Sequence, residues 1–260
     1  ALVSAGTDLD SLEIPAYATS TGTVYRVTAI ADSAFYNVGY LRTRLTKIIL
    51  PNTINTIGAY AFAGYKVLRE ISIPDQLITM GDRAFLACSV LDNVIIPGTL
   101  VTIPNYAFSQ CTALKNITLS EGVRMIMQST FSDCTSLKQI TLPQSLTTIS
   151  HYAFSSCSSL KTIVIPDKVS DIYVGAFTDC TKLTQVQLPA GLTKLWSAAF
   201  RKCPLQSLYL PEKLTYISAS SFMCDNLSAV YCAATTIPKL QDSTAFYFSD
   251  ASGETMVDTL

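Results

Sequence analysis

The chain is poor in charged residues and in several residue types on which catalysis commonly depends. Asp, Glu, Lys and Arg make up 14% of its 260 residues, against roughly a quarter in an ordinary soluble domain. It has one histidine, His151, and one tryptophan, and its formal net charge is −1. A net charge so close to zero gives no electrostatic footprint for nucleic acid or for an anionic membrane.

Sequence signatures of catalysis and of membrane insertion are also missing. There is no Gly-x-Ser-x-Gly elbow and no glycine-rich phosphate loop, and a single histidine excludes metal sites built on several imidazoles. His151 occupies a turn position that Ala59, Asp82 and Asn105 hold in other copies of the repeat described below, so we interpret it as an exposed spacer. No apolar run approaches the roughly 18 residues of a membrane span. The sequence therefore predicts no catalytic residue, no metal site, no cofactor and no enzyme.

What the chain has in abundance is one repeated unit of about 23 residues. The segment 134–154 reads Cys-x-x-Leu-x-x-Ile-x-Leu-Pro-x-x-Leu-x-x-Ile-x-x-x-Ala-Phe, and every step of its phenylalanine from Phe62 to Phe200 is 23 residues. The repeated phenylalanines are Phe35, Phe62, Phe85, Phe108, Phe131, Phe154, Phe177, Phe200, Phe222 and Phe246. A register kept over so many copies indicates a solenoid, in which units that cannot bury an apolar face alone stack on their neighbours.

Each unit encodes two short extended pieces and a turn. The apolar-x-apolar step before proline has the period of two that is typical of a half-buried strand. Proline lacks an N–H for the strand ladder and ends the strand. A second extended piece follows, such as 146–149, and a turn carrying Ala-Phe leads to the next copy. We therefore predict a solenoid of stacked parallel β-strands with short second strands and turns.

The repeat divides the chain into three parts. Residues 1–40 form a degenerate repeat that we expect to act as an N-terminal cap, with a hairpin or loop tip at 19–23. Residues 41–232 hold the regular units. Residues 233–260 form an irregular last repeat, which we expect to be truncated because Leu260 stands where a new strand should begin.

Six of the eight cysteines follow the repeat. They are Cys88, Cys111, Cys134, Cys157, Cys180 and Cys203, each three residues after a repeated phenylalanine. Residues one period apart lie about 4.8 Å from each other across neighbouring strands, so we expect a column of thiols in the core, either as small buried hydrophobes or as a disulfide or metal ladder. Tyr65 holds the same place in an earlier unit. Cys224 falls one residue short of the column, and Cys232 takes a core strand position.

Two sets of surface residues are candidates for binding. Exposed aromatic residues gather in the C-terminal third, and because Tyr and Trp are enriched at interface hot spots, we predict a ligand-binding surface at Tyr173, Trp196, Tyr209, Tyr216 and Tyr231. One alternative is that these aromatic columns only stabilise the sheet. Another is that the five residues, which come from three columns, lie on different faces.

The second set is a column of like charges. Lys115, Lys138 and Lys161 lie one period apart and allow a basic stripe for acidic ligands such as glycosaminoglycans. The flanking copies carry Asp92 and Thr184 at this position, which favours an ordinary solvated face.

The repeated Leu-x-x-Ile-x-Leu/Ile-Pro motif with its trailing Ala-Phe resembles the BspA-like leucine-rich repeat family, from about residue 12 to residue 260. The chain departs from the pattern at Ser120, where proline is missing, and in lacking an anchoring segment. The resemblance implies a curved right-handed solenoid on secreted or surface-anchored proteins of host-associated bacteria and some parasitic protists.

The same resemblance implies a role in adhesion, often to host matrix proteins such as fibronectin. We accordingly expect an extracellular or cell-surface interaction module for a protein ligand, for instance a host extracellular matrix protein. The alternatives are a structural spacer and a carbohydrate-binding surface protein. The sequence indicates no oligomeric state.

Overall fold

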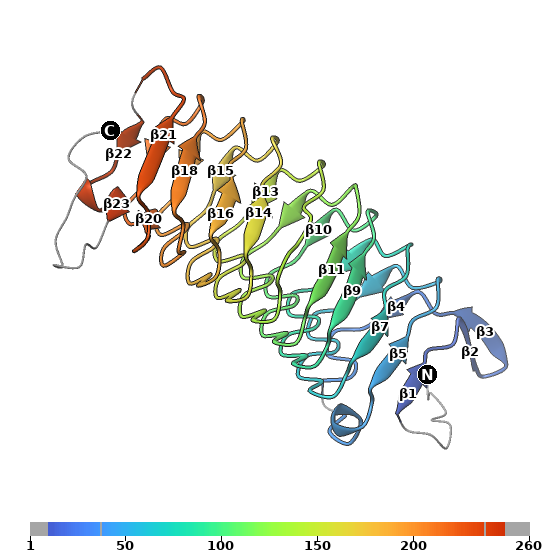
Figure 1. Cartoon of the computed structure of the whole chain (residues 1–260). Coiled ribbons are helices and arrows are strands. Elements are labelled where there is room, and N and C mark those ends of the chain that lie inside the picture. Colours follow the sequence, from blue (N-terminus) through green and yellow to red (C-terminus); the bar gives the residue numbers. More distant parts are fainter. Residues whose placement is uncertain (1–9, 37, 237, 248–260) are drawn as a thin grey trace.

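The computed structural model describes residues 10–36, 38–236 and 238–247, and its chain winds as an elongated solenoid of parallel strands (Figure 1). The predicted fold class is confirmed. Successive strands pair in parallel exactly one repeat apart, for example Asn93 with Asn116 and Ile149 with Ile172. Parts of the predicted end repeats, residues 1–9 and 248–260, lie outside the described residues.

All but one of the coils contribute a strand of three or four residues to a side that we call the long-strand face. Its strands are β1 (Ser11–Glu13), β5 (Lys47–Ile49), β7 (Glu70–Ser72), β9 (Asn93–Ile96), β11 (Asn116–Leu119), β14 (Thr162–Val164), β16 (Gln185–Gln187), β18 (Ser207–Leu210) and β21 (Ala229–Cys232). Between β11 and β14 the coil makes a single bridge, from Thr141 to Thr118.

Strands of two residues form a second side, the short-strand face. They are β4 (Ala29–Ile30), β6 (Thr56–Ile57), β8 (Thr79–Met80), β10 (Thr102–Ile103), β12 (Met125–Ile126), β13 (Thr148–Ile149), β15 (Asp171–Ile172), β17 (Lys194–Leu195), β19 (Tyr216–Ile217) and β22 (Lys239–Leu240). The last seven of these make one continuous parallel sheet.

The remaining elements lie near the two ends of the solenoid. They are the hairpin β2 (Tyr17–Ser20) and β3 (Thr23–Arg26), the 3-10 helices η1 (Leu41–Thr43) and η2 (Ser243–Ala245), and the parallel pair β20 (Phe222–Met223) and β23 (Phe246–Tyr247). The hairpin expected at 19–23 is confirmed as an antiparallel pair. Thr21 and Gly22 both have positive φ at its tip, as a type I′ turn requires.

The repeated phenylalanines form an unbroken stack through the core. Neighbouring rings from Phe35 to Phe246 lie 5.1–5.9 Å apart between centroids and within 23° of parallel. The rings from Phe62 to Phe222 are completely buried. The backbone of the same turns is hydrogen-bonded from coil to coil, as in the bond from the Phe62 N–H to the Ala84 carbonyl at 2.8 Å. The turns thus act as a third ladder beside the two strand faces.

The cysteines form the expected column in the core. The six evenly spaced thiols are fully buried, and all eight cysteines are free. Each S–H donates a hydrogen bond of 3.1–3.3 Å to the carbonyl of the phenylalanine of the preceding coil, as Cys134 does to Phe108. Tyr65, in the same slot, donates from its hydroxyl to the Phe35 carbonyl at 3.1 Å. The slot therefore requires a hydrogen-bond donor as well as apolar bulk.

The structure places the two remaining cysteines and corrects the prediction for Cys232. Cys224 joins the column despite its short spacing, because it is buried and donates to the Phe200 carbonyl at 3.2 Å. Cys232, predicted at a core position, is exposed. It pairs with the buried Leu210, but β21 is the last strand of its sheet, and no further strand among the described residues covers it.

The coil without its proline at Ser120 gains a hydrogen bond. The Ser120 N–H, which proline would lack, donates to the Ile96 carbonyl at 3.0 Å. The next residues pass very close to the preceding coil, so a Cβ at Gly98 would clash with the Glu121 carbonyl oxygen, and Gly122 has a φ of +110°. Glycine is required at both positions.

Candidate functional site

The structure separates the five predicted aromatic residues into two groups on different faces. Tyr209 and Tyr231 lie on the long-strand face, in β18 and β21. Tyr173, Trp196 and Tyr216 belong to the short-strand side of the coil. The five residues therefore do not share one face, because the corner that follows each long strand turns the chain from one face to the other. Their role in ligand binding stays a prediction.

Tyr209 and Tyr231 form an exposed, stacked pair. They are direct partners in the parallel ladder, their ring centroids lie 4.7 Å apart, and the ring planes differ by 13°. Tyr209 is 67% exposed and Tyr231 is 52% exposed. Within the described part of the chain neither hydroxyl has a hydrogen-bond partner. The pair offers a flat aromatic surface and two free hydroxyls to a ligand.

The pair stands at the end of a column of outward-facing residues along the long-strand face. Ile95 and Val164 belong to the same column and are 63% and 55% exposed. Their neighbours in sequence point inward, as in the alternating exposed and buried pattern of β9 and β18. The exposure expected of Tyr209 and Tyr231 is confirmed.

The short-strand group is a half-buried ladder whose polar atoms are mostly engaged. The ring of Trp196 stacks on Tyr173 at 6.4 Å and meets Tyr216 edge-on at 6.0 Å. Its indole N–H donates to the Asp171 carboxylate at 3.2 Å. The Tyr216 hydroxyl bonds the side chain of Gln241 at 3.1 Å. These contacts join one coil to the next, and they leave less free aromatic surface than the Tyr209–Tyr231 pair.

His151 extends the short-strand ladder by one ring. It is exposed, as predicted, with its ring 5.1 Å from that of Tyr173 and its Nδ1 3.3 Å from the Ser150 hydroxyl. Nowhere in the described residues do three or more His, Cys, Asp or Glu side chains gather as a metal site.

Sequence reasoning missed a further aromatic column on the turns of the N-terminal half. The guanidinium of Arg83 lies between the rings of Tyr60 and Tyr106, at 5.4 and 4.5 Å from their centroids. These residues lie 23 apart, two positions before the core phenylalanine, which is the signal that could have revealed the stack. Such cation–π contacts stabilise neighbouring coils by roughly 0.5–1 kcal/mol each when exposed.

The comparison with protein families agrees with this geometry. Residues 28–161 and 147–253 match the model of the BspA type leucine rich repeat region, with six copies. The chain belongs to this family. BspA-type repeats form a scaffold that is typically not enzymatic. Among curated proteins none matches.

Several solved leucine-rich repeat structures resemble the chain. A leucine-rich repeat protein of T. pallidum is 25% identical, with a TM-score of 0.50 over 75% of this chain and 76% of that one. One from Bacteroides ovatus is 21% identical, with a TM-score of 0.46 over 91% and 83%. The pneumococcal vaccine antigen PcpA is 22% identical, with a TM-score of 0.49 over 94% and 82%. These likenesses concern the fold.

Across the part of the chain that the structure describes, no helix has the length and apolar character needed to cross a membrane.

Proposed function

We propose that this BspA-type solenoid is a secreted or cell-surface interaction module that binds a protein ligand on its long-strand face. The observation that carries the proposal is the exposed, stacked pair Tyr209–Tyr231. A rigid tyrosine supplies large contact area at low entropic cost and a polar atom at its tip, which is why Tyr is enriched at binding hot spots.

The rest of the face suits an extended partner. Ile95 and Val164 place exposed apolar side chains along the same column, so a partner laid across the coils meets apolar contacts at intervals. Because the coils are joined by three ladders of hydrogen bonds, the face is rigid before binding and loses little entropy on association. The resemblance to the BspA family points to a host extracellular matrix protein as the partner, and the module acts by adhesion rather than by catalysis.

The experiment replaces the two exposed tyrosines, whose side chains lie outside the core, so the fold should be kept. Tyr209→Ser with Tyr231→Ser is measured for binding to a panel of immobilised matrix proteins that includes fibronectin. The matched control is Tyr17→Ser with Tyr25→Ser, two tyrosines of the N-terminal hairpin that are 60% and 55% exposed.

We expect the first variant to lose at least tenfold in affinity, because each hot-spot tyrosine is worth about 1–2 kcal/mol or more, and the control to bind as the unchanged chain does. Equal binding by all three proteins would remove the pair from the interface. Absence of binding to every matrix protein in the panel would argue for a structural spacer.

A further inference from the structure

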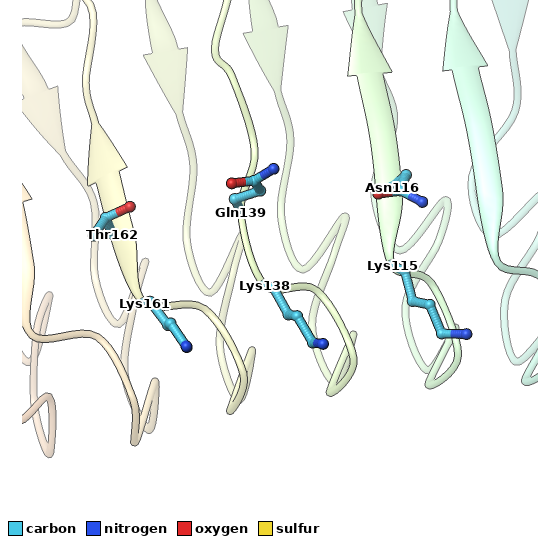
Figure 2. Close-up of a pocket in the computed structure, with 6 residues that line it drawn as sticks. All are labelled: Lys115, Asn116, Lys138, Gln139, Lys161 and Thr162. Atoms are coloured by element: carbon cyan, nitrogen blue, oxygen red, sulfur yellow. The ribbon is translucent and has the colours of Figure 1, made fainter.

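The long-strand face carries a row of three uncompensated lysines in the middle of the solenoid. Lys115, Lys138 and Lys161 are exposed and lie on three successive coils, with the Lys161 N–H bonded to the Lys138 carbonyl at 3.2 Å. Coils are about 4.8 Å apart, so the three ammonium groups span on the order of 10 Å along the solenoid axis. Figure 2 shows the three side chains pointing the same way.

The row borders a shallow hollow that contains no acidic side chain. The hollow has a volume of about 460 Å³ and is lined by the three lysines together with Asn116, Gln139 and Thr162 (Figure 2). Amides and a hydroxyl thus stand directly beside the ammonium groups. Such groups can donate to anionic oxygens and can exchange hydrogen bonds with sugar hydroxyls.

Elsewhere the solenoid pairs opposite charges at one-coil spacing, and here it does not. The two ion pairs of the described residues, Lys47 with Glu70 and Lys202 with Asp179, both join neighbouring coils. None of the three lysines of the row takes part in an ion pair with a described residue. The three lysines stand just before the long-strand positions of three successive coils, where like charges one coil apart repel each other, so this row holds a positive potential that an anion would relieve.

The nearest acidic residue of the same row is already engaged. The carboxylate of Asp92 accepts from the side-chain amide of Asn93 at 2.5 Å, and the Asn93 carbonyl oxygen accepts from the Asn116 amide at 2.7 Å. This amide relay ends at Asn116, beside Lys115. The negative charge at the edge of the row is therefore partly satisfied without any lysine.

We infer that the row Lys115–Lys138–Lys161 binds an acidic polysaccharide, a sugar chain bearing sulfate or carboxylate groups, laid along the solenoid axis. An open row of charges at regular spacing fits an extended polyanion better than a compact one. The adjoining amide and hydroxyl groups match a ligand rich in hydroxyls. Single-stranded nucleic acid fits less well, because no aromatic side chain lines the hollow for a base to stack on.

This site is separate from the proposed protein-binding pair, which lies on β18 and β21 toward the C-terminal end of the same face (Figure 1). The two proposals therefore stand or fail independently.

The test compares two triple variants with equal charge. The row variant is Lys115→Ala, Lys138→Ala and Lys161→Ala. The control is Lys66→Ala, Lys168→Ala and Lys213→Ala, which removes three exposed lysines from other parts of the coils. Binding to a heparin oligosaccharide is measured by calorimetry at low and at physiological salt, beside a neutral dextran and a single-stranded DNA of similar charge.

We expect the unchanged chain and the control to bind heparin and the row variant to bind it roughly tenfold more weakly, since each exposed charge contact is worth a factor of about two to five. Binding should weaken with salt, because the contacts are solvent-exposed. The melting temperature of the row variant should not fall, because removing its lysines relieves repulsion.

Three results would overturn the inference. The first is no heparin binding by the unchanged chain, and the second is equal loss in both variants. The third is DNA binding as tight as heparin binding and equally dependent on the row, which would assign the row to polyanions by charge alone.

Discussion

At the scale of single residues, the position three after each core phenylalanine is defined by a hydrogen bond. A buried carbonyl without a partner is costly, and each such phenylalanine carbonyl receives a donor from the next coil. Cysteine supplies it from Cys88 onward, and Tyr65 supplies it where the preceding step is longer. Cysteine fits the slot because it combines small apolar bulk with an S–H donor.

Removing the Tyr65 hydroxyl should therefore lower the stability of the protein even though the aromatic ring remains. We expect Tyr65→Phe to lower the free energy of unfolding by about 1 kcal/mol, because the Phe35 carbonyl loses the hydroxyl donor and keeps only the 3.4 Å bond from the Val38 N–H. Chemical denaturation measures the loss. Tyr25→Phe, at an exposed side chain, should stay within about 0.5 kcal/mol of the unchanged protein; an equally small effect at Tyr65 would contradict the role of the bond.

The same thiols should make the protein sensitive to alkali. Burial raises the pKa of the Cys88 and Cys224 thiols from 9.0 to about 12, and it holds the pKa of Cys111, Cys157 and Cys203 well above 9.0. Below pH 9 these thiols are protonated in the folded and the unfolded chain, so their contribution is fully present. Above pH 9 only the unfolded chain ionises, and each thiol lowers stability by about 1.4 kcal/mol per pH unit until its folded pKa is reached.

We expect the melting temperature to be nearly flat up to about pH 9 and to fall steeply between about pH 9 and pH 12. Thermal denaturation followed by circular dichroism over this range measures the effect. Cys232→Ser should leave the curve unchanged, because this side chain is exposed. A melting temperature that stays flat above pH 9 in the unchanged protein would contradict the buried column.

At the scale of the element, the backbone conformation of the turn around Ala-Phe could not be predicted from the sequence. Two of its positions, two before and two after the phenylalanine, take positive φ with ordinary side chains, such as Tyr106 and Gln110 around Phe108. Non-glycine residues rarely adopt this conformation. The ladder of backbone bonds between turns offsets the cost, as when the Tyr106 N–H donates to the Gln128 carbonyl at 2.9 Å. Glycine, the usual marker of positive φ, appears in this turn only at Gly64 and Gly175 among the described copies.

The loss of stability on removing a ring from the phenylalanine stack should depend on the position of that ring. Phe131 lies between the rings of Phe108 and Phe154, at 5.9 and 5.3 Å, whereas Phe246 stacks on Phe222 alone among the described residues. We expect Phe131→Ala to cost about 3–5 kcal/mol of unfolding free energy and Phe246→Ala clearly less. Denaturant unfolding of both variants measures the difference, and equal losses would show that contact between successive rings adds nothing to burial.

At the scale of the whole molecule, the columns of equivalent side chains could be predicted from the sequence. The corner that separates the two strand faces within each coil could not. The stacked phenylalanines and the thiol column follow directly from the 23-residue spacing. Tyr209 and Tyr216 lie only seven residues apart in the sequence, yet the corner at Pro211 sends them to different faces. Cys232 was expected in the core because its equivalents are buried, but burial there also requires a covering strand. The period predicts which side chains stack on one another in successive coils. It does not predict the angle at which each coil turns between the two faces, or whether a further strand covers the last coil.

One whole period should be removable from the middle of the solenoid. Deleting residues 132–154 joins Phe131 to Ser155 and places each side chain on the same type of neighbour as before, because each coil contacts only the coils beside it. We expect a folded, cooperative protein with a modestly lower melting temperature. Deleting residues 132–143 alone should unfold the chain, since it shifts strands onto turns. Circular dichroism and thermal melts distinguish the two, and similar behaviour of both deletions would contradict the stacking register.

The accessibility of Cys232 has a practical consequence. Seven of the eight sulfurs are sealed inside the protein and one lies open next to Tyr231. A maleimide dye should therefore attach to the native chain at this one site without any engineering. Because Cys232 faces the side of β21 opposite to Tyr231, the dye would leave the stacked tyrosines free and its emission would report on any partner that covers the core side of this last paired strand.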